Sequence, residues 1–101
     1  MIVIRWQAPL KPTKEQAIMI FRAEDLTPRE EILEVDKEYP EDRHPFDEVR
    51  MILEGELAMN INGNQLLLRA GDKIVIPSNT KHSQKVLRDQ PCKTIVANKP
   101  F

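Results

Sequence analysis

The sequence lacks several features that define whole classes of protein. It has one cysteine, Cys92, in 101 residues, which excludes an internal disulfide and a C-x-x-C zinc or redox motif. No apolar run approaches the roughly 20 residues that span a bilayer. The opening MIVIRWQAPLKP has neither the basic region nor the small-residue cleavage site of a secretory signal. Gly-rich phosphate loops and nucleophile elbows are also missing. We therefore expect a cytoplasmic protein without a membrane partner.

What the sequence does contain is typical of one ordinary globular domain. Apolar residues make up 41% and charged residues 31% of the chain, enough for a core and too apolar for disorder. Residues 30–48 hold nine acids against two basic residues, and residues 64–101 hold seven basic residues against two acids. Neither block is a continuous run, and nothing forms the basic stripe of a nucleic-acid binder.

The hydrophobic periodicity predicts a β-rich fold with one helix near the start. Thr13 and Gln16 form a capping-box pattern ahead of apolar residues at helical spacing, which predicts a helix over residues 14–25. A strand is expected before it in MIVIRW. After Pro28 the period changes to two, and Asn62-Gly63 indicates a type I′ hairpin. The expected later strands are 29–35, 49–53, 57–61, 65–69, 73–76, 82–87 and 94–97.

One of the two histidines lies among acids in EDRHPFDEV, residues 41–49. Asp42 and His44 are two residues apart, so on an extended segment their side chains project to the same side, and Glu48 keeps this parity. Imidazole nitrogens and carboxylate oxygens are the donors that divalent metals take. The stretch alone also fits a solvated turn, so the position of the second histidine, His82, decides between these interpretations.

His82 lies in a second stretch, RAGDKIVIPSNTKHSQKV, residues 69–86. Together the two stretches resemble the cupin family, whose first motif is G-x5-H-x-H-x3,4-E-x6-G and whose second is G-x5-P-x-G-x2-H-x3-N. The matching positions are His44, Glu48 and Gly55 in the first motif and Gly71, Pro77 and His82 in the second. The resemblance implies an all-β cupin jelly roll of two packed antiparallel sheets, with ligand or metal inside.

Four positions depart from these motifs. Asp36 and Asn79 replace glycines, and both residue types tolerate left-handed turn geometry. Val86 replaces the final asparagine, which is not a ligand in the family. Asp42 stands where the family has its first histidine; an aspartate can still ligate, but with a shorter reach and a negative charge.

The resemblance implies a divalent metal site made of Asp42, His44, Glu48 and His82. Fe, Mn, Ni or Zn would suit these donors. The expected function is a metal-dependent oxygenase or isomerase acting on a small molecule, which could be anionic. The alternative is a non-catalytic binding or sensing cupin with a degenerate site, in which His44 and Glu48 pair with each other.

Two further residues are candidates for substrate binding. Arg50 shares the parity of Glu48 and could grip a carboxylate or phosphate inside the barrel, or it pairs with a neighbouring glutamate. Gln84, with Tyr39 and Phe46, flanks the expected pocket.

We expect a single domain over residues 1–101, with a strand and helix in residues 1–28 and the barrel core in residues 29–101. A small-molecule ligand is the expected partner. Small cupins resemble dimer formers, and the apolar start MIVI could supply an edge strand for a homodimer.

Overall fold

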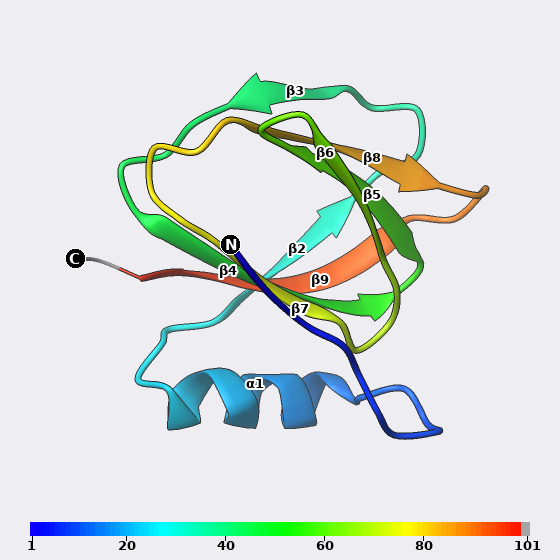
Figure 1. Ribbon diagram of the computed structural model, residues 1–101. Helices are drawn as coiled ribbons and strands as arrows, with labels where there is room; N and C mark the ends of the chain where they lie inside the picture. The colour runs from blue at the N-terminus through cyan, green and yellow to red at the C-terminus, as the bar shows by residue number, and fades with distance from the viewer. Residues whose placement is uncertain (100–101) are drawn as a thin grey trace.

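The fold, seen in a computed structural model that describes residues 1–99, is a pair of antiparallel β-sheets packed face to face (Figure 1). One sheet has the strand order β1-β7-β4-β9-β2 and the other β3-β8-β5-β6. The strands are β1 (Ile2–Ile4), β2 (Arg29–Leu33), β3 (Tyr39–Asp42), β4 (Asp47–Glu54), β5 (Glu56–Ile61), β6 (Asn64–Leu68), β7 (Lys73–Ile76), β8 (His82–Leu87) and β9 (Cys92–Lys99). The expected all-β class of two packed antiparallel sheets is confirmed.

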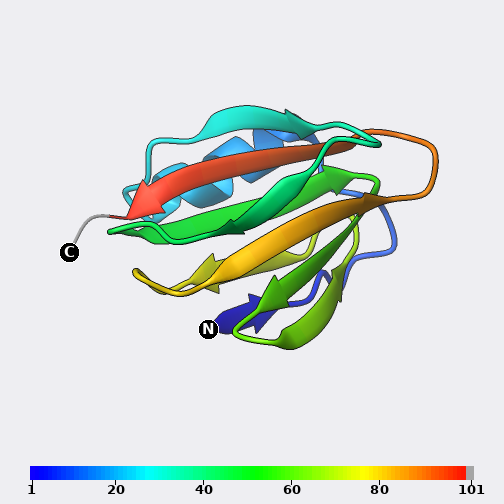
Figure 2. The same cartoon turned by 90° about the horizontal axis from the view of Figure 1, so that it is seen from above.

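The helix α1 (Lys14–Ala23) covers the outer face of the five-stranded sheet (Figures 1 and 2). It begins where the sequence predicts, because Thr13 and Gln16 form the complete capping box. It ends two residues earlier than expected. Phe21, which is fully buried, packs against the outward side chains of β4 and β9 in a cluster with Val49 and Ile95. Among residues 1–99 no helix is long and apolar enough to cross a membrane.

The predicted turns take the geometry that their residues favour. Asn62 and Gly63 have φ angles of 51° and 86° and join β5 to β6, which confirms the hairpin. Asp36 and Asn79, at the two glycine positions of the family motifs, have φ angles of 64° and 57°. The left-handed conformation is therefore kept without glycine.

Strand β3 is absent from the sequence-based strand prediction. Its residues, YPED, combine a proline with two acids, a composition that is rare in strands. The segment is extended because it pairs with β8, where Tyr39 lies opposite Gln84 and Asp42 lies opposite His82. The register shifts between these two pairs, so β3 is a short and irregular edge of its sheet.

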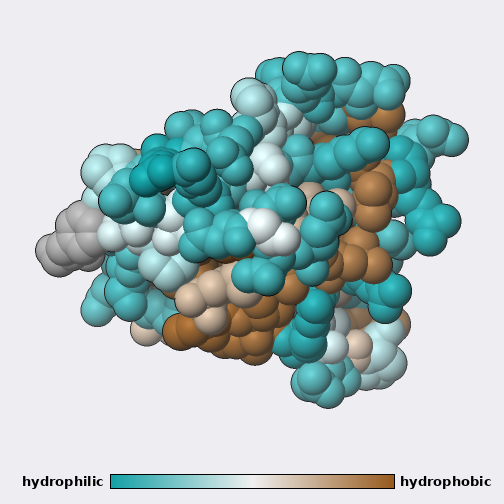
Figure 3. All heavy atoms as spheres, turned by 45° about the horizontal axis from the view of Figure 1, so that its top comes forward, coloured by the Kyte–Doolittle hydropathy of each residue, from teal (hydrophilic) through white to brown (hydrophobic). Residues whose placement is uncertain are grey.

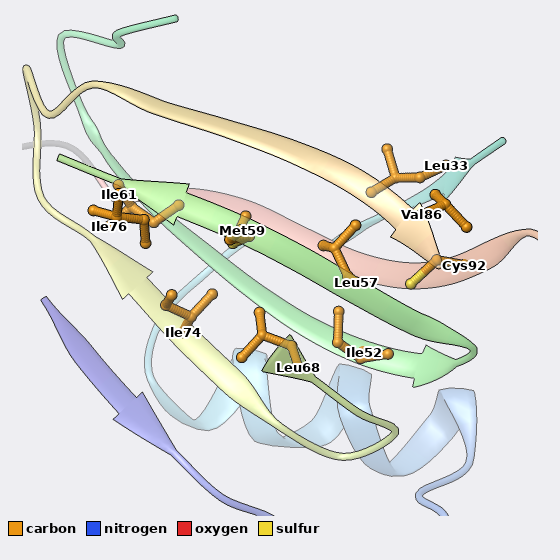
Figure 4. Packing of buried hydrophobic residues seen from close by; sticks show 10 residues of the cluster. All are labelled: Leu33, Ile52, Leu57, Met59, Ile61, Leu68, Ile74, Ile76, Val86 and Cys92. Carbon is orange, nitrogen blue, oxygen red and sulfur yellow. The ribbon is translucent and has the colours of Figure 1, made fainter. Parts of the chain in front are cut away.

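The main hydrophobic core fills the space between the two sheets. Ten buried side chains meet there (Figure 4). They are Leu33, Ile52, Leu57, Met59, Ile61, Leu68, Ile74, Ile76, Val86 and Cys92. Strand β4 serves both cores, because Ile52 points between the sheets while Met51 and Leu53 point towards the helix. Glu48 and Arg50 share the parity of Ile52, so the same face of β4 changes from apolar to charged along its length.

Asp72 fastens the N-terminal segment to the sheets. Its carboxylate accepts hydrogen bonds from the Arg5 guanidinium at 2.7 Å and from the backbone N–H groups of Trp6 at 3.1 Å and Arg69 at 2.9 Å. Burial raises the pKa of Asp72, but these hydrogen bonds outweigh it and hold the pKa below its usual value. Beside it, Gly71 has a φ of 95°, and an added Cβ would overlap the Trp6 side chain. This junction therefore needs both residues.

Replacing Asp72 by asparagine should lower the free energy of unfolding at pH 7 by about 1–3 kcal/mol, because one N–H donor would face an amide NH₂ instead of an acceptor. The folded-state pKa is depressed, so the wild-type contribution is complete above an ordinary aspartate pKa and is lost as the pH falls through the lower folded value. Urea unfolding from pH 7 down to pH 3 should show the two proteins converging. Asp89→Asn, at an exposed position, is the control, and an equal loss in that variant would contradict the role of Asp72.

Cys92 should be chemically inert in the folded protein. Burial raises the pKa of its thiol to about 11, although the positive charge of Arg50 acts in the opposite direction. Because the thiolate is the reactive form, a disulfide reagent at pH 8 should label Cys92 only after denaturant is added. Rapid labelling of the folded protein would show that the core opens at this strand.

Candidate metal centre

His44, Glu48 and His82 converge at one end of the space between the sheets. Each offers one donor atom, and these atoms all lie within 4.8 Å of one another. Glu48 is the second residue of β4, His82 is the first residue of β8, and His44 lies in the connection between β3 and β4. The group thus joins one residue from each sheet with one from a loop.

Glu48 is held in place by Arg50. Its Oε2 accepts a hydrogen bond from Arg50 Nε at 3.3 Å, and its Oε1 lies 3.8 Å from His44 Nε2. Arg50 is itself fixed, since its other nitrogens contact Thr94 Oγ1 at 2.9 Å and Glu31 Oε1 at 3.0 Å. Both Glu48 and Arg50 are buried. One carboxylate oxygen is therefore occupied within the protein, and the other faces the two imidazoles.

The orientation of His82 is set by the backbone just before its strand, β8. Its Nδ1 lies 3.0 Å from the carbonyl oxygen of Thr80. A carbonyl only accepts hydrogen bonds, so Nδ1 carries the proton, and Nε2 of the neutral ring keeps its lone pair for a metal. His44 is oriented differently: its ring stacks on Phe46 with centroids 5.0 Å apart and planes 2° from parallel. The two imidazole centroids are 5.1 Å apart.

Asp42 lies at the rim and not in this group. Its side chain is exposed, and its Oδ1 accepts a hydrogen bond from the backbone N–H of Arg43 at 2.8 Å. Asp42 and His44 were expected to project to the same side, and this requires the chain to be extended through both residues. Strand β3 ends at Asp42, so His44 lies in the irregular connection to β4, where the alternation of side chains no longer applies.

The three converging residues border a cavity of about 330 Å³ that opens at this end of the sheets. Its lining includes both residues proposed for substrate binding, Arg50 and Gln84, and also Asp42. The Arg50 guanidinium contacts two glutamates, Glu31 and Glu48, so its geometry is that of the pairing alternative. Gln84 Oε1 is buried and has no hydrogen-bond partner within the described part of the chain.

The sequence analysis missed three residues that position these groups. They are Glu31, Thr94 and, through its carbonyl, Thr80. Glu31 shares the parity of buried Leu33, and Thr94 shares that of buried Cys92. This alternation was a usable signal that both side chains face the interior. The carbonyl of Thr80 leaves no such trace, because any residue supplies one.

The donor set suits a divalent ion. Two imidazole nitrogens and one carboxylate oxygen on one face are the ligands of open metal sites in proteins. Each fixed ligand also has the outer partner that such sites normally possess, Arg50 for Glu48 and the Thr80 carbonyl for His82.

Comparison with known structures finds many similar folds. A cupin protein from Bacteroides fragilis is 23% identical with a TM-score of 0.64, covering 72% of this chain and 64% of that one. The DMSP lyase DddQ from Ruegeria pomeroyi is 27% identical with a TM-score of 0.65, covering 73% and 38%. FeII HppE is 23% identical with a TM-score of 0.63, covering 76% and 44%. This chain thus spans less than two thirds of each of these three proteins.

Comparison with curated protein sequences finds no match. Comparison with protein families matches residues 29–98 to the cupin domain. That range contains both motifs, all three converging residues and strands β2 to β8 complete. The two-sheet fold, the motif spacing and this match agree, and the chain belongs to the cupin family.

Proposed function

We propose that this protein binds a divalent metal ion through His44, Glu48 and His82 and that a small molecule binds beside the ion in the adjoining cavity. The observation that carries the proposal is the convergence of the three donors within 4.8 Å. Three protein ligands leave positions free for an oxygen atom of the small molecule. Asp42, whose carboxylate accepts a hydrogen bond from the backbone N–H of Arg43, is not part of this set.

The surrounding residues prepare the ligands before any ion arrives. Arg50 keeps the Glu48 carboxylate from turning away and partly balances its charge, while Thr80 fixes the ring of His82. When bound, a divalent ion supplies a positive centre that polarises an oxygen donor and lowers its pKa. The stacking of His44 on Phe46 places a third ligand without a hydrogen bond.

The reaction class that we propose is that of a metal-dependent oxygenase or isomerase, because the three-residue ligand set would leave coordination positions of the ion free. Two of the similar structures are described as an iron(II) protein and as a lyase, so this fold does carry metal-linked and catalytic proteins. Fold alone does not assign a reaction. A non-catalytic sensing or binding protein is the alternative if the site takes up no metal, because the cavity would remain.

His82→Ala should abolish metal uptake, because it removes one of only two imidazoles. Elemental analysis of wild-type protein after incubation with Fe(II), Mn(II), Ni(II) or Zn(II) should give about one ion per chain for the preferred metal. The bound ion should also stabilise the fold, by about 2.7 kcal/mol at a hundredfold excess over the dissociation constant. Equal uptake in wild type and in His82→Ala would show that the ion binds elsewhere.

Asp42→Asn provides the matched test of the ligand set. Because the Asp42 carboxylate faces the backbone of Arg43, this variant should keep the metal stoichiometry of the wild type and change the affinity by less than about fivefold. Loss of the ion on this substitution would instead restore the four-ligand set that the family motif suggests.

We also propose that two copies associate through β1. This strand lies at the edge of the five-stranded sheet, and its Ile2 and Ile4 are 59% and 53% exposed. Figure 3 shows hydrophobic surface at the lower centre of the view, where the N-terminal strand lies.

Sedimentation should give a dimer, and Ile2→Lys with Ile4→Lys should shift it to the monomer, because charges on an edge strand oppose pairing. A dimer with a dissociation constant of about 10 μM would be mostly associated at about 100 μM, so a wild type that is monomeric at that concentration would contradict this.

A further inference from the structure

The strongest feature that the metal group leaves unexplained is the side-chain oxygen of Gln84. It is buried, and no N–H or O–H group of residues 1–99 donates to it. Buried polar atoms almost always have a partner, and the exceptions call for an explanation. Gln84 lies on β8 two residues after His82, so the two side chains share a face and stand about 7 Å apart along the strand.

The neighbouring side chains show why this oxygen lacks a donor. Gln84 is opposite Tyr39 on β3 and opposite Met59 on β5. A thioether has no N–H or O–H to offer. The Tyr39 hydroxyl is directed elsewhere, because it accepts a hydrogen bond from the backbone N–H of Glu34 at 2.9 Å. The Gln84 and Tyr39 side chains line both the cavity beside the metal group and a second cavity next to it, so a ligand bound there is the remaining source of a donor for Oε1.

The charges around the cavity beside the metal group restrict which small molecules can enter it. Its lining has five carboxylates and two guanidinium groups. A divalent ion would leave one negative charge in excess. Glu31 and Glu48 are paired with Arg50, and Glu41 lies 4.0 Å from the ammonium group of Lys81, so the remaining acids, Glu38 and Asp42, face Arg29. An anion would meet like charge at this rim, whereas a neutral or positively charged molecule would not.

We propose that the small molecule of this site carries a hydrogen-bond donor, a hydroxyl or a protonated amine, which Gln84 Oε1 accepts while an oxygen of the same molecule binds the metal. The molecule is neutral or cationic. Gln84 thereby selects the ligand and is not needed to hold the metal. This inference rests on the proposed function, because it takes the metal as the anchor for the other end of the ligand.

The test uses three hydroxamic acids with a common metal-binding group and a common two-carbon spacer, bound to zinc-loaded protein and followed by calorimetry. The tails are an ammonium in β-alanine hydroxamate, a methyl in butyrohydroxamate and a carboxylate in succinic monohydroxamate. Wild-type protein should bind the ammonium tail about tenfold more tightly than the methyl tail, as one hydrogen bond to a charged donor allows. The carboxylate tail should bind most weakly.

Gln84→Met removes the acceptor while keeping the length of the side chain, and it should reduce the preference for the ammonium tail by about fivefold without changing zinc stoichiometry. Gln84→Glu, which keeps an acceptor, should retain the preference. Gln90→Met is the matched control, since Gln90 is exposed and lines neither cavity; its preference should equal that of the wild type. In the absence of probe, Gln84→Met should melt no lower than the wild type, because no internal hydrogen bond is lost.

Two results would overturn the inference while leaving the proposed function intact. One is zinc binding with the same tail preference in wild type and Gln84→Met. The other is a melting temperature several degrees lower in Gln84→Met, which would show that Oε1 already has a structural partner. Failure of the wild-type protein to bind zinc would instead remove the proposed function, and this inference with it.

Discussion

The buried contact between Glu48 and Arg50 is the interaction on which the site depends. It connects three adjacent strands, because Arg50 on β4 also contacts Thr94 on β9 and Glu31 on β2. Burying an isolated charge is costly, and a carboxylate and a guanidinium tolerate burial only when each has partners. Here the partners come from consecutive strands of one sheet, so the pairing of the sheet and the orientation of the carboxylate are settled together.

The contact between Glu48 and Arg50 also lies where the hydrophobic core between the sheets ends and the cavity begins. Along the inward face of β4 the residues change from Glu48 through Arg50 to Ile52. The apolar end is packed by the hydrophobic core and the polar end borders the cavity. A 101-residue chain has little surface to bury, so the boundary between the two ends lies within a single strand. The helix supports the same strand from outside through Met51 and Leu53.

Much of the fold was predictable from local patterns. The capping box, the Asn62-Gly63 hairpin and the alternation in residues 82–87 each depend on neighbours in the sequence, and all three were confirmed. Strand β3 was not predictable, because its composition opposes a strand and only pairing with β8 makes it one. The same limit applies to the site: motif spacing indicated His44, Glu48 and His82, but whether Asp42 faces them depends on where β3 ends. The partners of Arg50 required knowledge of which strands are adjacent.

The placement of the three donors on different layers has a mechanical consequence. Glu48 belongs to the five-stranded sheet and His82 to the four-stranded sheet, so an ion held by both would be a crosslink between the two layers. The spacing of the layers at this end, set by the core side chains, would then govern how well an ion of a given radius fits. Core substitutions far from the cavity would tune metal selectivity through that spacing. Packing between the sheets and the choice of ion would thereby be linked in this chain.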